Sequence, residues 1–160
     1  MRIYLIGLPG VGKSTIGKRL AKQLDFHFID LDHYIEEEAL MFVDEIFVRY
    51  GEEYFRALES NALASVSKEE NIVVSCGGGI IKNVENKRAM TGICIYLRAS
   101  LEEIQLRLDE SRIERPLLIS KTVKDLYAER KSLYEAFADL TIENSSIDQT
   151  IAEIMERIQI

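Results

Sequence analysis

The sequence predicts an α/β protein with three layers, in which helices cover both faces of a five-stranded parallel β-sheet. Five short apolar runs have the length of buried strands, and stretches with apolar residues at helical spacing separate them. Strands that alternate with helices pair in parallel, because each crossover helix packs back onto the sheet. A glycine-rich segment also joins the first run to the first helical pattern. The predicted strands are Ile3–Ile6, Phe26–Leu31, Ile72–Cys76, Ile93–Leu97 and Leu140–Ile142.

Composition indicates a single domain across residues 1–160, with 47% hydrophobic residues available for one core. The net charge of −7 argues against a surface that binds nucleic acid or an acidic membrane. Cys76 and Cys94 lie in apolar runs and are expected to be buried thiols, which is typical of a reducing cytoplasm. No apolar run approaches the ~20 residues of a membrane span, and the chain starts on a predicted core strand. We therefore expect a cytoplasmic protein that binds neither nucleic acid nor membrane.

The segment GLPGVGKS, residues 7–14, fits the phosphate-loop pattern G-x-x-x-x-G-K-[ST]. It lies between a predicted strand and a helical pattern at Thr15–Leu24, where its backbone amides and the helix N-terminus can surround phosphates. Lys13 can reach the β- and γ-phosphates of a nucleotide, and Ser14 can ligate Mg²⁺. The alternative is a plain turn followed by an N-cap serine. The predicted nucleotide-binding residues here are Gly10, Val11, Gly12, Lys13, Ser14 and Thr15.

Asp30 and Asp32 stand at the end of the second predicted strand. Ligands of open α/β sheets bind beyond the carboxyl ends of the strands. If the strand continued through both residues, alternation would point the two carboxylates to one side. One could then hold Mg²⁺ through water while the other accepted a proton from a hydroxyl. The alternative is a capping pair, with Asp32 as the N-cap of a helix that begins at His33, and the residues alone leave both interpretations open.

Two arginines on predicted helices are candidates for anion binding. Arg130 lies four residues from both Leu126 and Tyr134 on an apolar face, so its guanidinium is expected to point inward. A buried charge needs a partner, and a ligand carboxylate suits the planar fork of arginine. Arg56 precedes Glu59 by three residues, a spacing that either orients the guanidinium or forms an exposed ion pair of little energetic weight.

Two glycine-rich or polar segments are also candidates for the site. The triple glycine 77–79 follows the third predicted strand and would let the backbone approach a ligand very closely; a flexible turn is the alternative. The polar, proline-containing segment 109–121 could be a mobile lid from which Arg115 swings onto the transferring phosphoryl group. An ordinary solvated loop is the alternative there.

Six pieces of sequence, in this order, resemble the shikimate kinase family, small phosphate-loop kinases of aromatic amino-acid biosynthesis. They are GLPGVGKS, DLD, FRALE, CGGG, RPLL and ERKSLYE, and the resemblance covers nearly the whole chain. It implies a fold like that of nucleoside monophosphate kinases, with strand order 2-3-1-4-5 and a substrate-binding subdomain at residues 32–60. It also implies transfer of a phosphoryl group from ATP to the 3-hydroxyl of shikimate, with Mg²⁺, and we expect a monomer.

The resemblance implies roles for individual residues. Lys13 and Arg115, both also nucleotide-binding, would stabilise the transferring phosphoryl group. Ser14 and, through water, Asp30 would serve Mg²⁺. Asp32 would hold the attacking hydroxyl and is the candidate for its base, while two arginines would clamp the carboxylate. The predicted substrate-binding residues are Asp32, Arg56, Gly77, Gly78, Gly79 and Arg130, with Val43, Phe47 and Phe55 as an apolar wall behind the ring.

Two positions depart from the usual pattern of that family. Members usually carry a Gly-x-Ser/Thr-Ile stretch where residues 39–43 read Ala-Leu-Met-Phe-Val, which bears on the packing of the substrate subdomain. Leu108 stands where the family often has an arginine that stacks on adenine. Arg107 or Arg112 would then take that role.

Two other functions are compatible with a phosphate loop. Another small-molecule kinase, for gluconate or a nucleotide, is disfavoured because an inward Arg130 and a triple glycine suit a small carboxylate. A GTPase-like switch would need Asn-Lys-x-Asp to read guanine, yet Asn86-Lys87 is followed by Arg88-Ala89, and the chain contains no Asp-x-x-Gly.

Overall fold

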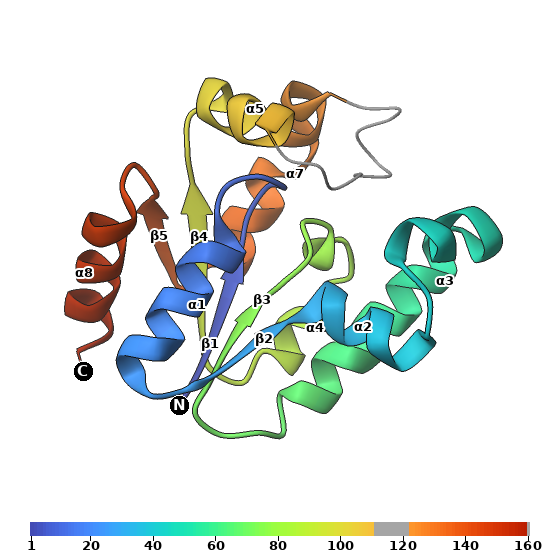
Figure 1. The fold of residues 1–160 in the computed structure, drawn as a ribbon, viewed down its shortest axis with the longest axis horizontal. Coiled ribbons are helices and arrows are strands. Elements are labelled where there is room, and N and C mark those ends of the chain that lie inside the picture. Colours follow the sequence, from blue (N-terminus) through green and yellow to red (C-terminus); the bar gives the residue numbers. More distant parts are fainter. Residues whose placement is uncertain (111–121, 160) are drawn as a thin grey trace.

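A parallel sheet with the strand order β2-β3-β1-β4-β5 runs through the centre of the molecule (Figure 1). The computed structural model describes residues 1–110 and 122–159. All four strand pairs are parallel, so the predicted sheet and its order are confirmed. The central strand is fully buried from Ile3 to Ile6, which explains its continuous apolar run. The strands are β1 Arg2–Ile6, β2 His27–Asp30, β3 Ile72–Ser75, β4 Ile93–Arg98 and β5 Leu140–Glu143.

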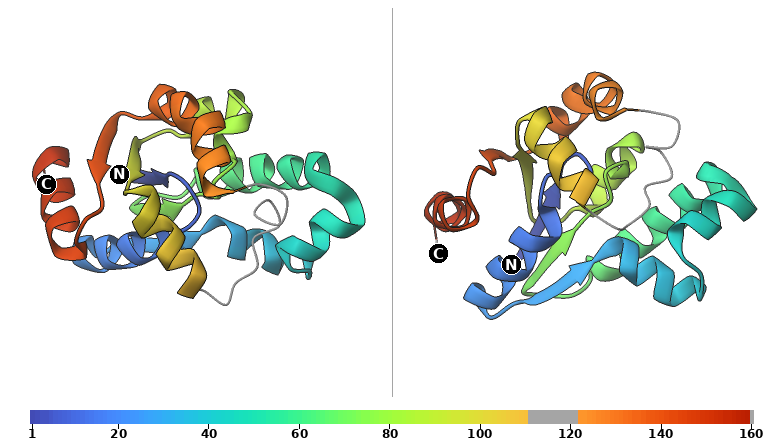
Figure 2. Two further views of the ribbon diagram at one scale, coloured as in Figure 1. Left: turned by 90° about the horizontal axis from the view of Figure 1, so that it is seen from above. Right: turned by 45° about the horizontal axis from the view of Figure 1, so that its top comes forward.

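Helices pack on both faces of the sheet and form the two outer layers (Figure 2). The first and last helices, α1 and α8, lie side by side on one face, while α7 and α4 lie on the other. The pair α2 and α3 extends beyond the β2 edge of the sheet (Figure 1). The helical segments are α1 Lys13–Leu24, α2 Leu31–Ala39, α3 Val43–Val66, the short 3₁₀ helix η1 Ile80–Lys82, α4 Glu85–Ala89, α5 Leu101–Glu110, α7 Val123–Phe137 and α8 Ile147–Ile158.

The position of β1 between β3 and β4 creates the crevice that a ligand can occupy. Leu5 of β1 lies opposite Ser75 of β3 on one side and Ile95 of β4 on the other. Connections from these strands leave in opposite directions at this point, and the loops beyond their carboxyl ends therefore separate. Segments 7–12 and 76–79 leave the sheet here, next to the end of β2.

The phosphate loop passes directly into α1, which begins at Lys13. The sequence pattern predicts a start at Thr15, two residues later, and that boundary is wrong. Gly12 is the N-cap, with a left-handed φ of 106°, and Gly10 has a φ of 82°. Side chains beyond Cα disfavour both conformations, so these glycines allow the loop to turn into the helix two residues early.

The predicted second strand is too long at its carboxyl end. β2 ends at Asp30, and α2 begins at the next residue, Leu31. Asp30 is the N-cap, since its Oδ1 accepts a hydrogen bond of 3.2 Å from the amide of His33. The prediction that strand alternation places Asp30 and Asp32 on one side is therefore wrong, and so is the alternative in which Asp32 is the cap. Asp32 lies in the first helical turn.

The helix after α2 is a single element, α3, with a break inside it. Gly51 has φ 87° and ψ 171°, which are not helical angles, and so divides α3 into segments 43–50 and 52–66. The second segment carries Arg56 and Glu59. Because glycine adopts this conformation without a steric cost, the chain can change direction here while the apolar faces on either side stay in contact with neighbours.

The helix α7 presents Arg130 to the interior and starts with a complete capping box. The hydroxyl of Thr122 accepts from the amide of Asp125 at 3.1 Å, and the carboxylate of Asp125 accepts from the amide of Thr122 at 3.3 Å. This exchange satisfies amide groups that a helix start leaves without partners.

We expect Thr122→Ala to lower the free energy of unfolding by about 1 kcal/mol, because the cap of α7 is lost. Urea unfolding of both proteins measures this difference. Lys124→Ala, an exposed change in the same helical turn, is the matched control and should leave stability nearly unchanged. Equal stability of Thr122→Ala and wild type would contradict the capping role.

Candidate active site

Lys13 and Ser14 lie at the junction of the phosphate loop and α1. The Lys13 ammonium donates to the carbonyls of Gly7 at 2.8 Å and Leu8 at 3.0 Å, so it lies along the inner side of the loop. The Ser14 hydroxyl donates to Asp30 Oδ2 at 2.9 Å and is 3.2 Å from the hydroxyl of Ser75. The first turn of α1 and the ends of β2 and β3 thus contribute hard oxygen atoms at one point.

The carbonyl of Val11 is held by two side chains from distant elements. Arg107 of α5 donates to it at 2.8 Å, and the amide of Asn144, just after β5, donates at 2.9 Å. Asn144 is buried, and its own oxygen accepts from Thr150 of α8 at 2.9 Å. These bonds fix the loop immediately before Gly12, whose missing Cβ would lie 2.5 Å from the Asn144 side-chain nitrogen.

Sequence analysis predicts Arg107 or Arg112 as the partner of adenine, and Arg115 as a catalytic lid residue. The structure places Arg107 against the phosphate loop, with its guanidinium also 3.4 Å from the Asn144 carbonyl. Arg112 and Arg115 lie outside the described residues, as does most of the predicted lid at 109–121. Its first two residues, Asp109 and Glu110, end the helix α5. The support of the loop by Asn144 is not predictable from sequence, since the contact spans 133 residues.

The triple glycine 77–79 turns away from β3 with charged side chains pressed against it. A Cβ on Gly79 would lie within 2.5 Å of the Arg56 guanidinium, and one on Gly78 would lie 3.2 Å from Arg130 Nη1. A Cβ on Gly77 would lie 2.8 Å from Glu59 Oε2 and 3.0 Å from Asp32 Oδ1. The glycines therefore provide the space that these charged groups occupy, and close approach of this backbone to a ligand stays a prediction.

Arg130 is the predicted inward arginine, and that placement is confirmed, since only 2% of it is exposed. Its Nε, Nη1 and Nη2 atoms are buried, and none has a hydrogen-bond partner among the described residues. The neighbouring Tyr134 hydroxyl donates to the Gly78 carbonyl at 2.5 Å, and its ring stacks on Tyr96 with centroids 5.0 Å apart. Arg130 is thus a buried cation held beside the glycine turn in a rigid aromatic setting, and it can bind an anion through two parallel bonds.

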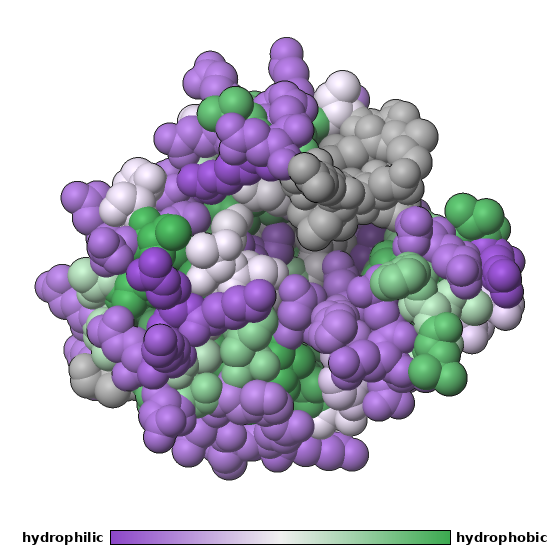
Figure 3. All heavy atoms as spheres, viewed as in Figure 1, coloured by the Kyte–Doolittle hydropathy of each residue, from purple (hydrophilic) through white to green (hydrophobic). Residues whose placement is uncertain are grey.

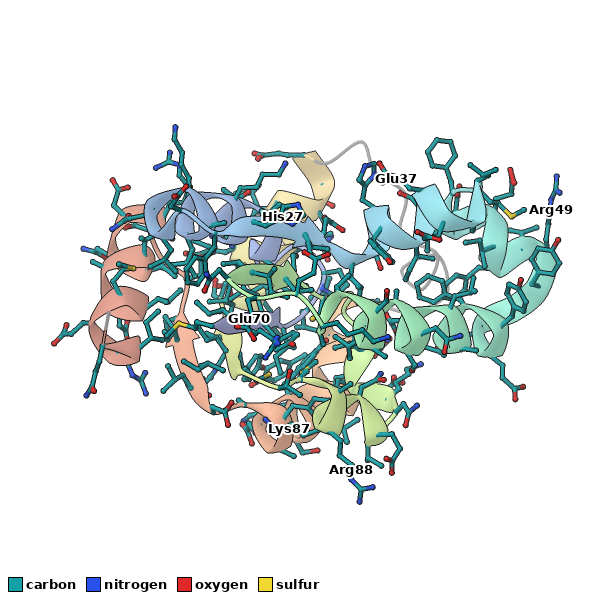
Figure 4. All side chains as sticks on the ribbon, turned by 90° about the horizontal axis from the view of Figure 1, so that it is seen from below. His27, Glu37, Arg49, Glu70, Lys87 and Arg88 are labelled. Atoms are coloured by element: carbon teal, nitrogen blue, oxygen red, sulfur yellow. The ribbon has the colours of Figure 1, made fainter. Side chains whose placement is uncertain are left out.

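Surface cations of the same chain have a different setting. Lys87 lies 3.5 Å from Asp139, and Arg88 lies 3.2 Å from Glu85 on the same helix. Figure 4 shows the labelled Arg88 projecting from α4 into solvent. Such exposed pairs contribute little to stability and are common on surfaces. Arg130 differs from these surface cations because its buried nitrogens have no hydrogen-bond partner among the described residues.

Arg56 is oriented by two carboxylates and two aromatic rings. Its guanidinium donates to Glu59 at 2.9 Å and to Glu52 at 3.4 Å. It also lies over the rings of Phe55 at 5.2 Å and Phe47 at 5.9 Å, and these rings contact each other. The alternative of a merely exposed ion pair with Glu59 is wrong, because Glu59 is only 1% exposed. Its burial keeps the Arg56 guanidinium in one orientation.

Asp32 and Glu59 each present a buried carboxylate oxygen to the glycine turn. Asp32 Oδ1 and Glu59 Oε2 have no hydrogen-bond partner among the described residues. Burial, reinforced by the Asp30 charge, raises the pKa of Asp32 from 3.8 to about 6. Burial likewise raises the pKa of Glu59 from 4.5 to about 7, although Arg56 opposes the shift. The sequence predicts for Glu59 only that it orients Arg56, because the helical spacing of the two residues makes them neighbours.

One hollow of about 700 Å³ joins the phosphate loop to the glycine turn. Its lining among the described residues includes Lys13 and Ser14 on one side and Asp32 and Gly78 on the other. Two residues of the phosphate loop and the Asp32 carboxylate therefore face the same space, which is the arrangement that direct group transfer between two bound molecules requires.

A protein-family model described as shikimate kinase matches residues 9–159. The chain belongs to the shikimate kinase family. A relative named shikimate kinase from Caldanaerobacter subterraneus subsp. tengcongensis is 41% identical and covers 98% of this chain and 92% of its own. A shikimate kinase from Clostridium botulinum (strain Alaska E43) is 39% identical over 98% of this chain and 96% of the relative.

Solved structures of the family have the same fold. A shikimate kinase from Bacteroides thetaiotaomicron superposes with a TM-score of 0.90 at 32% identity, covering 100% of this chain and 99% of the other. The shikimate kinase from Acinetobacter baumannii in complex with shikimate gives 0.87 at 32% identity, with coverage of 98% and 92%. The predicted family and the kinase fold class are thereby confirmed. Within residues 1–110 and 122–159, no helix combines the length and apolar character needed to cross a membrane.

We expect Asp32→Asn to stabilise the protein at pH 8 by roughly 1–3 kcal/mol. In wild type, the folded state keeps the Asp32 proton up to about pH 6, whereas the unfolded chain releases it near 3.8. The free energy of unfolding therefore falls as pH rises between these values, and the asparagine variant lacks that loss.

Urea unfolding at pH 4, 6 and 8 measures the effect. The stability difference should be small at pH 4 and grow toward pH 8. Asp25→Asn removes an exposed carboxylate and is the control that should show no such growth. Parallel pH curves for wild type and Asp32→Asn would contradict a buried carboxyl of raised pKa.

Proposed function

We propose that this protein transfers a phosphoryl group from ATP to the 3-hydroxyl of shikimate. The observation that carries the proposal is the single hollow that Lys13 and Asp32 both line, with the unpaired guanidinium of Arg130 at the adjoining glycine turn. A nucleotide, a hydroxyl and a carboxylate each have a complementary group there. The relatives named shikimate kinase, and the relative solved with shikimate, support this substrate.

The nucleotide side consists of the phosphate loop and its supports. The amides of residues 10–15 would surround the β- and γ-phosphates at the positive N-terminus of α1. The Lys13 ammonium, which donates to two loop carbonyls, would turn to the γ-phosphoryl group and stabilise the charge that develops there. Arg107 lies next to the loop and would contact the nucleotide. Arg115 is proposed to reach the same phosphoryl group from the lid at 109–121.

Ser14 and Asp30 fit a Mg²⁺ ion. Their oxygens lie 2.9 Å apart, with the Ser75 hydroxyl 3.2 Å from that of Ser14, so hard oxygen donors gather beside the phosphate loop. We propose that Ser14 binds the ion directly and Asp30 through water. When bound, Mg²⁺ supplies positive charge that neutralises the phosphate oxygens.

The acceptor side would hold shikimate by its carboxylate and its hydroxyls. Arg130 offers an unpaired buried fork, and Arg56 offers a guanidinium that Glu59 holds in place. Asp32 Oδ1 would accept the hydrogen bond of the attacking 3-hydroxyl, since this oxygen has no other described partner. With a pKa of about 6, Asp32 is mostly ionised at neutral pH and can take the hydroxyl proton as phosphoryl transfer proceeds.

The remaining proposals concern the surroundings of the site. Residues 32–60 would act as the substrate-binding subdomain, with amides of Gly77–Gly79 close to the acceptor. Val43, Phe47 and Phe55 would form the apolar wall behind the shikimate ring. The centroids of the Phe47 and Phe55 rings lie 4.9 Å apart. We propose that one chain contains the complete site, so that a monomer is sufficient for activity.

An ADP-release assay tests the proposal directly. With ATP and Mg²⁺ present, we expect turnover with shikimate, much less with quinate, and none above background with gluconate or a nucleoside monophosphate. Quinate shares the carboxylate but has a different ring, so it separates carboxylate binding from hydroxyl placement. Preferred turnover of gluconate or a nucleoside monophosphate would overturn the proposed acceptor while leaving a kinase.

We expect Arg130→Met to weaken shikimate binding roughly 10–150-fold, the equivalent of a lost charged hydrogen bond of about 1.5–3 kcal/mol. The affinity for ATP should stay the same. The stability of the empty protein should not fall, because the variant removes a buried charge that has no described partner.

Isothermal titration with each ligand and urea unfolding measure these three quantities. Arg88→Met, on the exposed face of α4, is the matched control. The primary amide of shikimate extends the test, since it should bind wild type poorly yet lose little more in Arg130→Met. Tight binding of the amide by wild type would show that the carboxylate is not recognised.

A further inference from the structure

The short connection between α2 and α3 is organised by one residue, Glu36. Its backbone carbonyl accepts from the amides of Leu40 and Met41, where the chain leaves α2. Its side chain then crosses the turn, and Oε2 accepts from the amide of Val43 at 2.9 Å. Val43 is the first residue of α3, and the residue before it, Phe42, provides no side-chain cap. The carboxylate of Glu36 thus gives a partner to the first amide of α3, one of the amides that a helix start leaves without an intrahelical acceptor.

The segment that follows packs on the core through Ile46, with Val43 and Phe47 partly buried against it. It runs from Val43 to Tyr50 and is separated from the rest of α3 by the break at Gly51. Val48 is 87% exposed and Phe42 is 71% exposed, whereas Ile46 is fully packed. Figure 3 shows apolar surface gathered at this end of the molecule, over α3. A helix of about two turns is not stable by itself. The position of this segment therefore depends on its packing and on the chain connections at its two ends, the turn from α2 and the break at Gly51.

This segment forms part of the acceptor side of the hollow. Glu36, Phe42 and Val43 line the hollow itself. One turn further along, Phe47 packs on Phe55 and under the guanidinium of Arg56. A shift of the segment would therefore move the wall of the hollow and the rings that support Arg56 together.

We propose that Glu36 is a positioning residue for the acceptor: its carboxylate binds the first amide of α3 and holds the segment Val43–Tyr50 against the acceptor side of the hollow. The inference rests on the proposed function for the identity of the acceptor. The contact itself, and its effect on the segment, do not depend on that identity.

Kinetics of four variants test the proposal. Glu36→Ala should raise the KM for shikimate by roughly 2- to 30-fold, the equivalent of a lost helix cap, while kcat and the KM for ATP stay near wild type. Glu36→Gln keeps an oxygen acceptor without the charge and should show a smaller rise. Glu38→Ala, an exposed change on the same helix, is the matched control.

The fourth variant is a rescue. Adding Phe42→Ser to Glu36→Ala provides a hydroxyl at the N-cap, with Glu45 three residues later to complete a capping box. Because Phe42 also lines the hollow, the reference is Phe42→Ser alone, and Glu36→Ala should raise the shikimate KM much less in that background than in wild type. A structural role elsewhere in the protein would not be restored by a cap at residue 42.

Amide hydrogen exchange checks the contact without an assay for activity. The Val43 amide should be protected in wild type and exchange faster in Glu36→Ala. Unprotected exchange of Val43 in wild type, an unchanged shikimate KM in Glu36→Ala, or no rescue by Phe42→Ser would each overturn the proposal. If wild type does not phosphorylate shikimate, the proposed function fails, and the exchange experiment still decides the role of Glu36.

Discussion

The candidate site depends on three consecutive positions that carry no side chain. Gly77, Gly78 and Gly79 leave space into which Arg56, Arg130 and two carboxyl groups fit from α2, α3 and α7. Any Cβ on Gly79 would overlap the Arg56 guanidinium, so the arginine would have to leave its place between its carboxylates and rings. The glycine turn is therefore a surface against which the charged side chains of α2, α3 and α7 pack.

This assembly holds buried polar atoms that have no hydrogen-bond partner among the described residues. The guanidinium of Arg130 and one oxygen each of Asp32 and Glu59 are buried without described partners. Unpaired buried polar groups are costly, and the raised pKa of both carboxyls reflects that cost. A ligand with a carboxylate and hydroxyl groups could form hydrogen bonds with these buried atoms. A ligand that lacks such groups would leave the atoms without partners, and this difference is a source of selectivity.

Local patterns predict most of the fold and part of the site. The apolar runs identify all five strands, and helical spacing places Arg130 inward, because both depend on periodicity that sequence displays directly. The boundary at Asp30 is missed because Asp is a strong N-cap, which ends β2 one residue before the predicted end at Leu31. The functions of Glu36, Glu59 and Asn144 depend on contacts across turns or between distant elements. No single-sequence pattern contains that information, and the order of the strands comes from family resemblance, not from the residues themselves.

The hydrogen bond from the Asn144 side chain to the Val11 carbonyl has a consequence for folding during synthesis. Gly12 lies in the first loop of the chain, but the side chains that hold this loop come from Arg107, Asn144 and Thr150. A ribosome makes these side chains long after it has made the loop, and a domain generally folds as a unit. The conformation of the loop described here therefore requires β5 and α8, which come from the far end of the chain.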